Sequence, residues 1–159
     1  MAMVRALAET CGKSGAYVHL GATSYDIVDT ANALQLKEAI SLIEEKLNRL
    51  ERALMEKAEK YKETIMVGRT HGQHALPITL GFKFAVWMRE VARHVERLRQ
   101  CKERILVGKI SGAVGTQAGL GPHAMEIQRI TMEKLGLKPA EITTPVSYTH
   151  LTLPTKRIV

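Results

Sequence analysis

The sequence predicts an all-α fold, a bundle of long helices. Residues 22–67 contain no Gly and no Pro, so nothing in them interrupts a helix. Apolar residues recur there at mainly alternating four- and three-residue steps, the a/d stripe of a helix that packs against other long helices. The stripe consists of Leu36, Ile40, Ile43, Leu47, Leu50, Leu54 and Tyr61. No segment shows a convincing strand pattern of alternating apolar and polar residues.

The first long helix is expected from about Asp26 to Tyr61. The turn before it contains Gly21, Thr23 and Ser24, and the two hydroxyls are suited to capping the first helical N–H groups. Helices of about 30 residues or more exceed the usual length in globular proteins. A helix of this length therefore indicates a bundle or an elongated oligomer.

Two further helices are expected. The second should run from about Thr79 to Val107, with Pro77 just upstream, where proline is tolerated. A third, shorter helix is expected from near Pro122 to Gly136. Its inward-facing apolar residues are expected to be Ile127, Ile130 and Leu135.

Length and composition are those of an ordinary globular chain. Of the 159 residues, 45% are apolar and 25% charged, as in soluble globular proteins. No window approaches the roughly 18 apolar residues of a membrane-spanning helix, and Met1–Leu7 is too short for a signal peptide. Cys11 and Cys101 lie far apart and match no zinc or redox spacing. We therefore expect a cytoplasmic protein in a reducing setting.

The charge balance fits two kinds of anionic partner. There are 23 basic and 16 acidic residues, a formal net charge of +7, which suits either nucleic acid or an anionic small molecule. Between Lys37 and Lys62, however, acids and bases alternate along a helix, as on a solvated face. The few aromatic residues are not interleaved with basic clusters, so a stacking platform for single strands is absent. We expect an anionic small substrate, and neither nucleic acid nor a membrane.

The sharpest candidate for chemistry is the polar segment Gly68–His74, expected as part of a loop over residues 67–77. It places His71 and His74 three residues apart beside Arg69, with glycines that let a ligand approach the backbone. His71 is suited to proton transfer, because histidine titrates nearest neutral pH. A metal site would need further ligands, and no glutamate is placed as in an HExxH site. A pair of hydrogen-bonded loop histidines is the structural alternative.

Two other polar segments lie at helix ends. In the segment His19–Asp26, Thr23 and Ser24 are either simple helix caps or part of a cradle for a carboxylate or phosphate. The glycine-rich segment from residue 111 to 121 follows a helix and matches neither the Rossmann nor the P-loop spacing. Close packing of helices is the expected role of most of its glycines. Gln117 is its one side chain with bidentate hydrogen-bonding capacity and is suited to face a ligand.

Together the three segments resemble the aspartase/fumarase superfamily and, within it, the adenylosuccinate lyase family most closely. The motifs that carry the resemblance are HLGATSYD at residues 19–26, GRTHGQHA at residues 68–75 and SGAVGTQ at residues 111–117. The resemblance covers about residues 1–145. It implies a largely helical fold without a metal or other cofactor, whose central bundle assembles as a homotetramer with each active site built from three subunits.

The resemblance also implies an activity: β-elimination of fumarate from adenylosuccinate, or from the succinylated carboxamide ribotide of purine synthesis. By resemblance, His71 is the general acid that protonates the departing nitrogen. Thr23, Ser24 and Gln117 match positions that bind substrate. His19 matches a histidine close to the substrate phosphate.

By the same resemblance, the chain is expected to be an internal piece of such an enzyme. Residues 1–20 would end an N-terminal helical domain, and residues 21–145 would be part of the central helical-bundle domain. The mobile serine loop that supplies the catalytic base would lie beyond residue 145, so the chain alone is expected to be inactive. Residues 146–159 read like the in-frame translation of a transposon-end sequencing adapter and are expected to be a non-native tail.

Two alternative functions stay open. A carboxymuconate cycloisomerase, or another lyase of the superfamily, shares the bundle and is close to this chain around residues 21–29. The cycloisomerase, however, typically lacks a histidine at the position of His71. A non-catalytic helical assembly module would explain the heptads and the charge pattern, but it would not explain the three polar segments.

Overall fold

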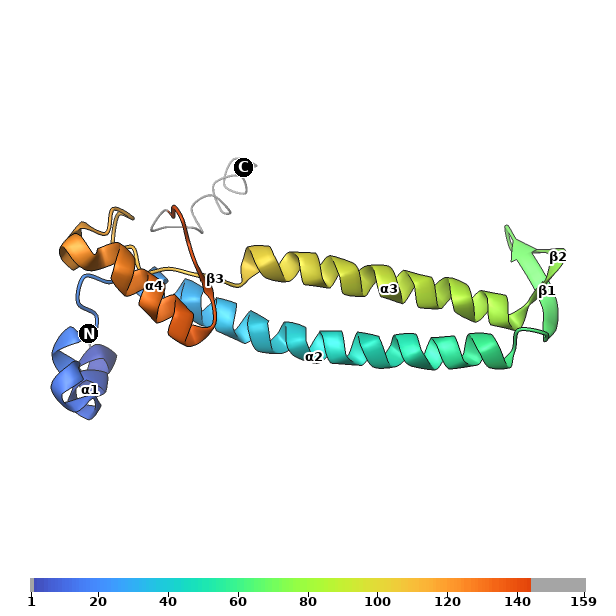
Figure 1. The fold of residues 1–159 in the computed structure, drawn as a ribbon, viewed down its shortest axis with the longest axis horizontal. Coiled ribbons are helices and arrows are strands. Elements are labelled where there is room, and N and C mark those ends of the chain that lie inside the picture. The colour runs from blue at the N-terminus through green and yellow to red at the C-terminus, as the bar shows by residue number, and fades with distance from the viewer. Residues whose placement is uncertain (1, 144–159) are drawn as a thin grey trace, which may run out of the picture. The chain divides into compact units, whose positions relative to one another are not determined.

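A computed structural model describes residues 2–143, and these are mostly helical (Figure 1). Two short two-stranded sheets interrupt the helices. The elements are the α-helices α1 (Ala2–Thr10), α2 (Ser24–Lys60), α3 (Leu80–Ile105) and α4 (Ala124–Leu135), the 3₁₀ helices η1 (Gly12–Tyr17) and η2 (Ala118–His123), and the strands β1 (Ile65–Thr70), β2 (Gln73–Thr79), β3 (Val107–Gly108) and β4 (Lys138–Pro139). Across residues 2–143, no helix carries an apolar stretch long enough to cross a lipid bilayer.

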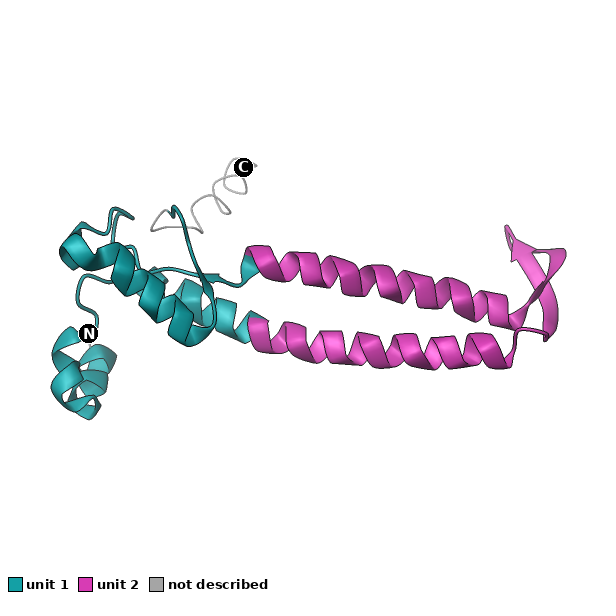
Figure 2. Ribbon diagram, viewed as in Figure 1, with its two compact units in different colours: residues 1–36, 105–159 teal, residues 37–104 magenta. Residues whose placement is uncertain are grey.

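The chain divides into two compact units (Figure 2). Unit 1 comprises residues 1–36 and 105–159, and unit 2 comprises residues 37–104. Helix α2 begins in unit 1 and continues into unit 2. The expected boundary between domains at residues 20 and 21 stays a prediction. The expectation for residues 146–159 lies outside the described residues.

Both long helices are confirmed. Helix α2 has 37 residues and α3 has 26, and every end lies within two residues of its expected place. Their prediction succeeded because a long stretch without Gly or Pro, carrying an apolar stripe at heptad spacing, favours a single uninterrupted helix. The all-α prediction is therefore confirmed for the bulk of the described chain.

Within unit 2, helix α3 and the part of α2 from residue 37 onward lie side by side (Figure 1). We call these two helical segments the arms of unit 2. Glu44 of α2 accepts hydrogen bonds from Arg99 Nε at 2.9 Å and from Lys102 Nζ, both on α3. At the other end of the arms, the Gly81 N–H donates to the Tyr61 carbonyl oxygen at 2.8 Å. A Cβ on Gly81 would lie 2.4 Å from a backbone oxygen of α2, so only glycine lets α3 begin this close to α2.

An antiparallel β-hairpin stands where the sequence predicted a polar loop. Strands β1 and β2 pair from Ile65 with Thr79 to Thr70 with Gln73. The register is irregular around Gly68, where a Cβ would lie 2.5 Å from the Leu76 carbonyl oxygen, so the position is a bulge that requires glycine. The prediction that the chain lacks strands is wrong here, because the bulge hides the alternation by which strands are recognised.

The buried cluster of unit 1 centres on Met132 of α4, which is 1% exposed. Ala33 of α2 and Leu137 complete it. Partly buried apolar side chains pack against it: Leu34, Leu106, Ile110 and Leu135. Strand β3 runs close by, since a Cβ on Gly108 would lie 2.4 Å from Met132 Sδ. Unit 1 therefore packs the chain after α3 against the first turns of α2 and against α4.

Helix α4 ends at the expected glycine, but most of the residues that it buries differ from those predicted. Gly136 has φ of 63° and caps the helix, as its conformational freedom allows. Ile127 and Ile130, predicted to be inward, are 38% and 39% exposed, whereas the expected contact of Leu135 with the core is present. The buried residues of α4 are Ala124, Gln128 and Met132. The prediction failed because the inward stripe contains a polar Gln128, which is buried only because backbone groups satisfy it.

Candidate functional site

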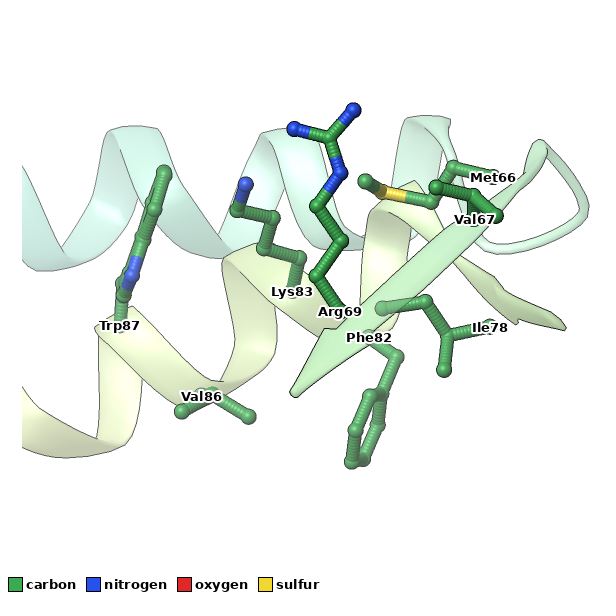
Figure 3. Close-up of a pocket in the computed structure, with 8 residues that line it drawn as sticks. All are labelled: Met66, Val67, Arg69, Ile78, Phe82, Lys83, Val86 and Trp87. Atoms are coloured by element: carbon green, nitrogen blue, oxygen red, sulfur yellow. The ribbon is translucent and has the colours of Figure 1, made fainter. Parts of the chain in front are cut away.

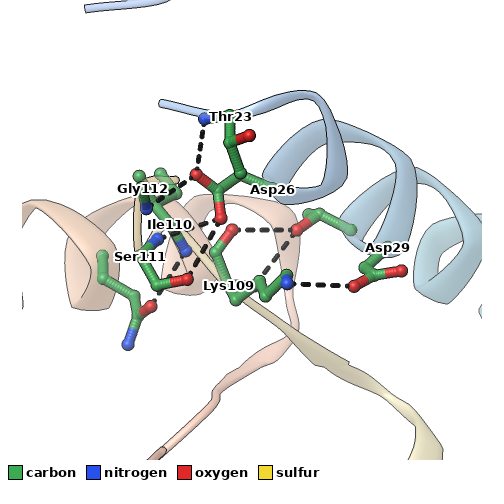
Figure 4. Close-up of polar contacts among 9 residues, drawn as sticks. Thr23, Asp26, Asp29, Lys109, Ile110, Ser111 and Gly112 are labelled. Atoms are coloured by element: carbon green, nitrogen blue, oxygen red, sulfur yellow. Dashed lines mark hydrogen bonds and ion pairs between the residues drawn. The ribbon is translucent and has the colours of Figure 1, made fainter. Parts of the chain in front are cut away.

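In unit 1, polar side chains hold the segment after β3 against the first turns of α2 (Figure 4). Four successive backbone N–H groups of this segment donate hydrogen bonds to side chains of α2 or α4. The bonds run from Lys109 to Thr30 at 3.1 Å, from Ile110 to Gln128 at 2.9 Å, and from Ser111 and Gly112 to Asp26 at 3.0 Å each. The segment is therefore positioned by side chains rather than by a sheet ladder.

Asp26 is the centre of this network and is 1% exposed. Its Oδ1 accepts from the N–H of Ser111 at 3.0 Å and from the Ser111 hydroxyl at 3.2 Å. Its Oδ2 accepts from the N–H of Gly112 at 3.0 Å and from the N–H of Thr23 at 2.9 Å (Figure 4). Four donors thus fill the lone-pair directions of one carboxylate, so its charge is buried without an unsatisfied oxygen.

An ion pair between a buried lysine and a partly exposed aspartate lies one turn further along α2. Lys109 Nζ is 3.2 Å from Asp29 Oδ2, and the lysine side chain is only 4% exposed. The Thr30 hydroxyl also donates to the Lys109 carbonyl oxygen at 3.1 Å. Charged groups of this kind are tolerated in a protein interior only when they are paired. Asp26 and Thr30 of α2 therefore anchor the backbone of the segment, whereas Asp29 contacts the side chain of Lys109.

Glycines bring the first and third polar segments into backbone contact. Gly21 has φ of +64°, and a Cβ on it would lie 2.7 Å from the carbonyl oxygen of Gly119. A Cβ on Gly112 would lie 3.0 Å from the carbonyl oxygen of Gly21. The expected close packing through glycine is present, but it joins the loop before α2 to Gly112 and to the 3₁₀ helix η2, and not two α-helices.

The structure brings four of the five predicted site residues into unit 1. Ser24 is exposed at the first residue of α2, and Thr23 beside it is half-buried. His19 is exposed in the loop before Gly21. Gln117 is half-buried, donates through its Nε2 to the Ile110 carbonyl oxygen at 3.3 Å, and keeps a second amide hydrogen and a carbonyl oxygen for a ligand.

Three backbone N–H groups near the start of α2 are engaged within the chain. The N–H groups of Thr23, Ser111 and Gly112 all donate to Asp26. Binding of a carboxylate or phosphate by Thr23 and Ser24, and of a ligand by Gln117, stays a prediction.

Three of the predicted site residues share a rare backbone conformation. His19 has φ of 66°, His71 has φ of 50° and Gln117 has φ of 61°, and no other non-glycine residue between positions 2 and 143 has a positive φ. A left-handed backbone at a residue with a side chain costs of order 1–3 kcal/mol and concentrates at functional sites. All three positions were selected from the sequence for other reasons, so the backbone supports their selection independently.

His71 belongs to unit 2, at the tip of the β-hairpin. Thr70 pairs with Gln73, so His71 and Gly72 alone form the connecting turn, and both have a positive φ, of 50° and 73°. This is the pattern of a type I′ turn, whose twist matches that of the paired strands. His71 is exposed there, which leaves its imidazole accessible to a ligand.

A pocket of about 370 Å³ lies beside the base of the hairpin, in unit 2 (Figure 3). Two cations, Arg69 of β1 and Lys83 of α3, lie among apolar side chains: Met66, Val67, Ile78, Phe82, Val86 and Trp87. Lys83 Nζ lies 5.2 Å from the centre of the Trp87 ring, a cation–π contact. None of the five predicted site residues lines this pocket, although Arg69 belongs to the same motif as His71.

Two charged groups of unit 2 have pKa values shifted by ion pairs. Hydrogen bonds from Lys102 and then Arg99 hold the pKa of Glu44 below its ordinary value. A hydrogen bond to Glu59 raises the pKa of Lys62 above its ordinary value. Both shifts come from exposed or partly exposed ion pairs that brace helices, so they do not mark a catalytic site.

Among residues 2–143, no three His, Cys, Asp or Glu side chains lie together in a way that would hold a metal ion. His71 lies in the hairpin turn, and His74 lies in β2.

Comparison with known proteins decides the family. A family model described as lyase matches residues 1–155. The chain belongs to this lyase family. It is 57% identical over 146 residues to the adenylosuccinate lyase of Pyrococcus abyssi, a match that covers 92% of this chain and 32% of that protein. The resemblance drawn from the three motifs is thereby confirmed.

Solved structures share the fold of this chain. The chain is similar to a fumarate lyase from Mesorhizobium sp. BNC1, with a TM-score of 0.86 and 38% identity over 98% of this chain and 37% of that one. It is similar to a 3-carboxy-cis,cis-muconate lactonizing enzyme from Pseudomonas putida, with a TM-score of 0.81 and 42% identity over 88% of this chain and 33% of that one. The chain spans about a third of the length of the relatives it matches.

These similarities weigh against both alternatives. Curated relatives that are 50–58% identical are adenylosuccinate lyases, whereas the lactonizing enzyme is 42% identical. A cycloisomerase is therefore not favoured. A non-catalytic assembly module is not favoured either, because membership of the lyase family accounts for the polar segments as well as for the long helices.

Sequence reasoning missed the residues that organise unit 1 of this lyase. Asp26, Thr30, Ser111 and Gln128 were not selected, although together they position the segment that contains Gln117. One local signal was present, because an acidic residue three positions after a Thr is the pattern of a capping box. The structure shows half of such a box, since the Asp26 carboxylate accepts from the Thr23 N–H. Its long-range partners left no signal in a single sequence.

Proposed function

We propose that the chain is part of an adenylosuccinate lyase. The observation that carries the proposal is the identity of 50–58% to curated adenylosuccinate lyases over more than nine-tenths of the chain. The reaction is the β-elimination of fumarate from adenylosuccinate, and from the succinylated carboxamide ribotide of purine synthesis. Both substrates are small anions, in keeping with the positive charge balance of the chain.

The reaction demands three groups. A base removes a proton from the carbon next to a carboxylate of the succinyl group, the bond to nitrogen breaks as the double bond of fumarate forms, and an acid protonates the departing nitrogen. We assign the acid to His71, whose exposure on a two-residue turn supports this role. The base is assigned to a serine loop outside residues 1–145, so the chain alone has no lyase turnover in this proposal.

Substrate binding is assigned to four residues of unit 1. Thr23 and Ser24 offer hydroxyls at the start of α2, and Gln117 offers its amide from the segment packed against that start. The exposure of His19 near the same glycine contacts supports a place close to the substrate phosphate. Hydroxyl and amide groups suit a carboxylate, because each donates a directed hydrogen bond to a charged acceptor.

We further propose that the full-length enzyme is a cytoplasmic homotetramer whose active sites combine residues of three subunits. Exposed large apolar side chains along unit 2 support assembly, because a surface of this kind is normally covered by a partner. They include Leu42, Ile43, Leu50, Met55, Phe82, Val86 and Trp87. Cys11 and Cys101, both free thiols, fit a reducing compartment.

The proposal is tested by substrate turnover. The full-length protein is incubated separately with adenylosuccinate, the succinylated carboxamide ribotide, argininosuccinate and 3-carboxymuconate, and the products are quantified. Release of fumarate from the two succinylated ribotides, at a kcat/KM far above that for the other compounds, supports the proposal. Preferential turnover of 3-carboxymuconate or argininosuccinate would replace it with another lyase of the family. The 159-residue chain is assayed in parallel, and measurable turnover by it would contradict the assignment of the base to another segment.

A further inference from the structure

We propose that Asp26 is the positioning residue of the substrate cradle, which consists of the hydroxyls of Thr23 and Ser24 and the amide of Gln117. This role rests on the proposed function, and no predicted site residue fills it. Its carboxylate ties the start of α2 to the segment that carries Gln117. Asp26 is too deeply buried, at 1% exposure, to touch a ligand itself. It acts through the residues that it holds.

The first link joins Asp26 to the hydroxyl side of the cradle. Asp26 Oδ2 accepts from the backbone N–H of Thr23 at 2.9 Å, and the Asp26 N–H donates to the Thr23 carbonyl oxygen at 3.1 Å. Both peptide groups that flank Thr23 are thereby engaged. These bonds fix the backbone that carries the side chains of Thr23 and the adjacent Ser24. Fixing a hydroxyl in advance removes the ordering cost that a ligand would otherwise meet on binding.

The second link joins Asp26 to the amide side of the cradle. Asp26 Oδ1 accepts from the N–H and the hydroxyl of Ser111. The Ser111 carbonyl oxygen in turn accepts from the Gln117 N–H at 2.9 Å, and the neighbouring Ile110 carbonyl oxygen accepts from Gln117 Nε2 at 3.3 Å. These bonds hold Gln117 in the left-handed conformation that a non-glycine residue adopts at a cost.

A carboxylate is the group that fits these contacts. All four of its partners are donors: three backbone N–H groups and one hydroxyl. An asparagine in its place would turn an NH₂ group toward at least one N–H donor, so one bond would be replaced by a repulsive contact. Asp26→Asn therefore keeps the size of the side chain and removes its positioning action.

The experiment compares the same substitution, Asp to Asn, at two positions of the full-length enzyme. Asp26→Asn is expected to raise KM for adenylosuccinate about tenfold or more with kcat changed by less than about threefold, because it loosens binding groups and leaves His71 untouched. Asp29→Asn is the matched control, since it alters the other aspartate of the chain, which pairs with Lys109 in the same unit. It is expected to lower the melting temperature and to leave KM within about twofold.

A double-mutant cycle separates positioning from stability. If Asp26 acts through Ser24, the KM effects of Asp26→Asn and Ser24→Ala do not add, whereas those of Asp29→Asn and Ser24→Ala do. Asp26→Asn with an unchanged KM, or with effects that add to those of Ser24→Ala, would overturn the proposal. If Asp26→Asn does not fold, Ser111→Ala is measured in its place, because it removes one of the four hydrogen bonds to Asp26. A raised KM at unchanged kcat then supports the proposal, and an unchanged KM contradicts it. A wild-type enzyme that releases no fumarate would refute the proposed function and not the positioning network.

Discussion

The carboxylate of Asp26 accepts hydrogen bonds from both the N–H and the hydroxyl of Ser111, which follows 85 residues later in the chain. One motif at the start of a long helix is thereby joined to another in the loop after the next long helix. The two segments meet through directed bonds to a buried charge and through glycine backbones that touch. This relationship explains how segments on either side of two long helices come together in unit 1.

The contact between Gly21 and Gly119 predicts a clear cost for a methyl group at Gly21. Gly21→Ala is expected to lower the free energy of unfolding by about 1–3 kcal/mol, because it combines a strained positive φ with a clash against the Gly119 backbone. Chemical denaturation of the full-length protein measures this loss.

Gly12→Ala is the matched control for that measurement. Gly12 also has a positive φ, of +54°, but a Cβ there would meet no atom within 4 Å. The difference between the two variants therefore isolates the clash from the backbone strain. Equal losses for both variants would show that the close approach of Gly21 to Gly119 is not present in solution.

The ion pairs of Glu44 predict a pH dependence of unit 2. Bonds from Lys102 and Arg99 lower the pKa of Glu44 in the folded protein, so its stabilising contribution is present above the ordinary value of 4.5 and is lost as the pH falls through the lowered pKa. The melting temperature of Glu44→Gln is therefore expected to lie below that of the wild type at pH 7, with a gap that closes below pH 4.5.

Glu45→Gln provides the comparison for Glu44→Gln. Glu45 is the neighbouring acid and is exposed on α2. Its substitution is expected to change the melting temperature little at any pH, because exposed charges contribute weakly to stability. A gap for Glu44→Gln that does not depend on pH, or that matches the effect of Glu45→Gln, would contradict the bracing role of the pair.

Much of the helical part of the fold could be predicted from the sequence. Helices α2 and α3 were predicted to within two residues, because a heptad stripe without Gly or Pro allows few other structures. The β-hairpin could not be predicted in the same way. Gly68 bulges in β1, Pro77 lies within β2, and a His–Gly pair forms the turn where Asn–Gly or Asp–Gly is the usual signal.

Sequence reasoning selected polar residues of the candidate site but not the residues that hold them. Ser24, His71 and Gln117 were selected because their side chains carry chemistry and lie in polar segments at the ends of the expected helices. Asp26 and Gln128 were missed, because their partners are backbone groups of a segment that is distant in sequence. Hydrogen bonds of this kind depend on tertiary packing, which leaves no periodic pattern in a single chain.

The central claim is tested most directly by the kinetics of His71→Asn. The variant is made in the full-length enzyme and assayed with adenylosuccinate as substrate. Asparagine tolerates the positive φ of the turn, so His71→Asn keeps the hairpin and removes the proton donor. We predict that kcat falls about 100-fold or more while KM stays within about threefold. His94→Asn, at an exposed histidine of α3, is the control and should retain wild-type kinetics. A folded His71→Asn enzyme with an unchanged kcat would contradict the assignment of His71 as the general acid.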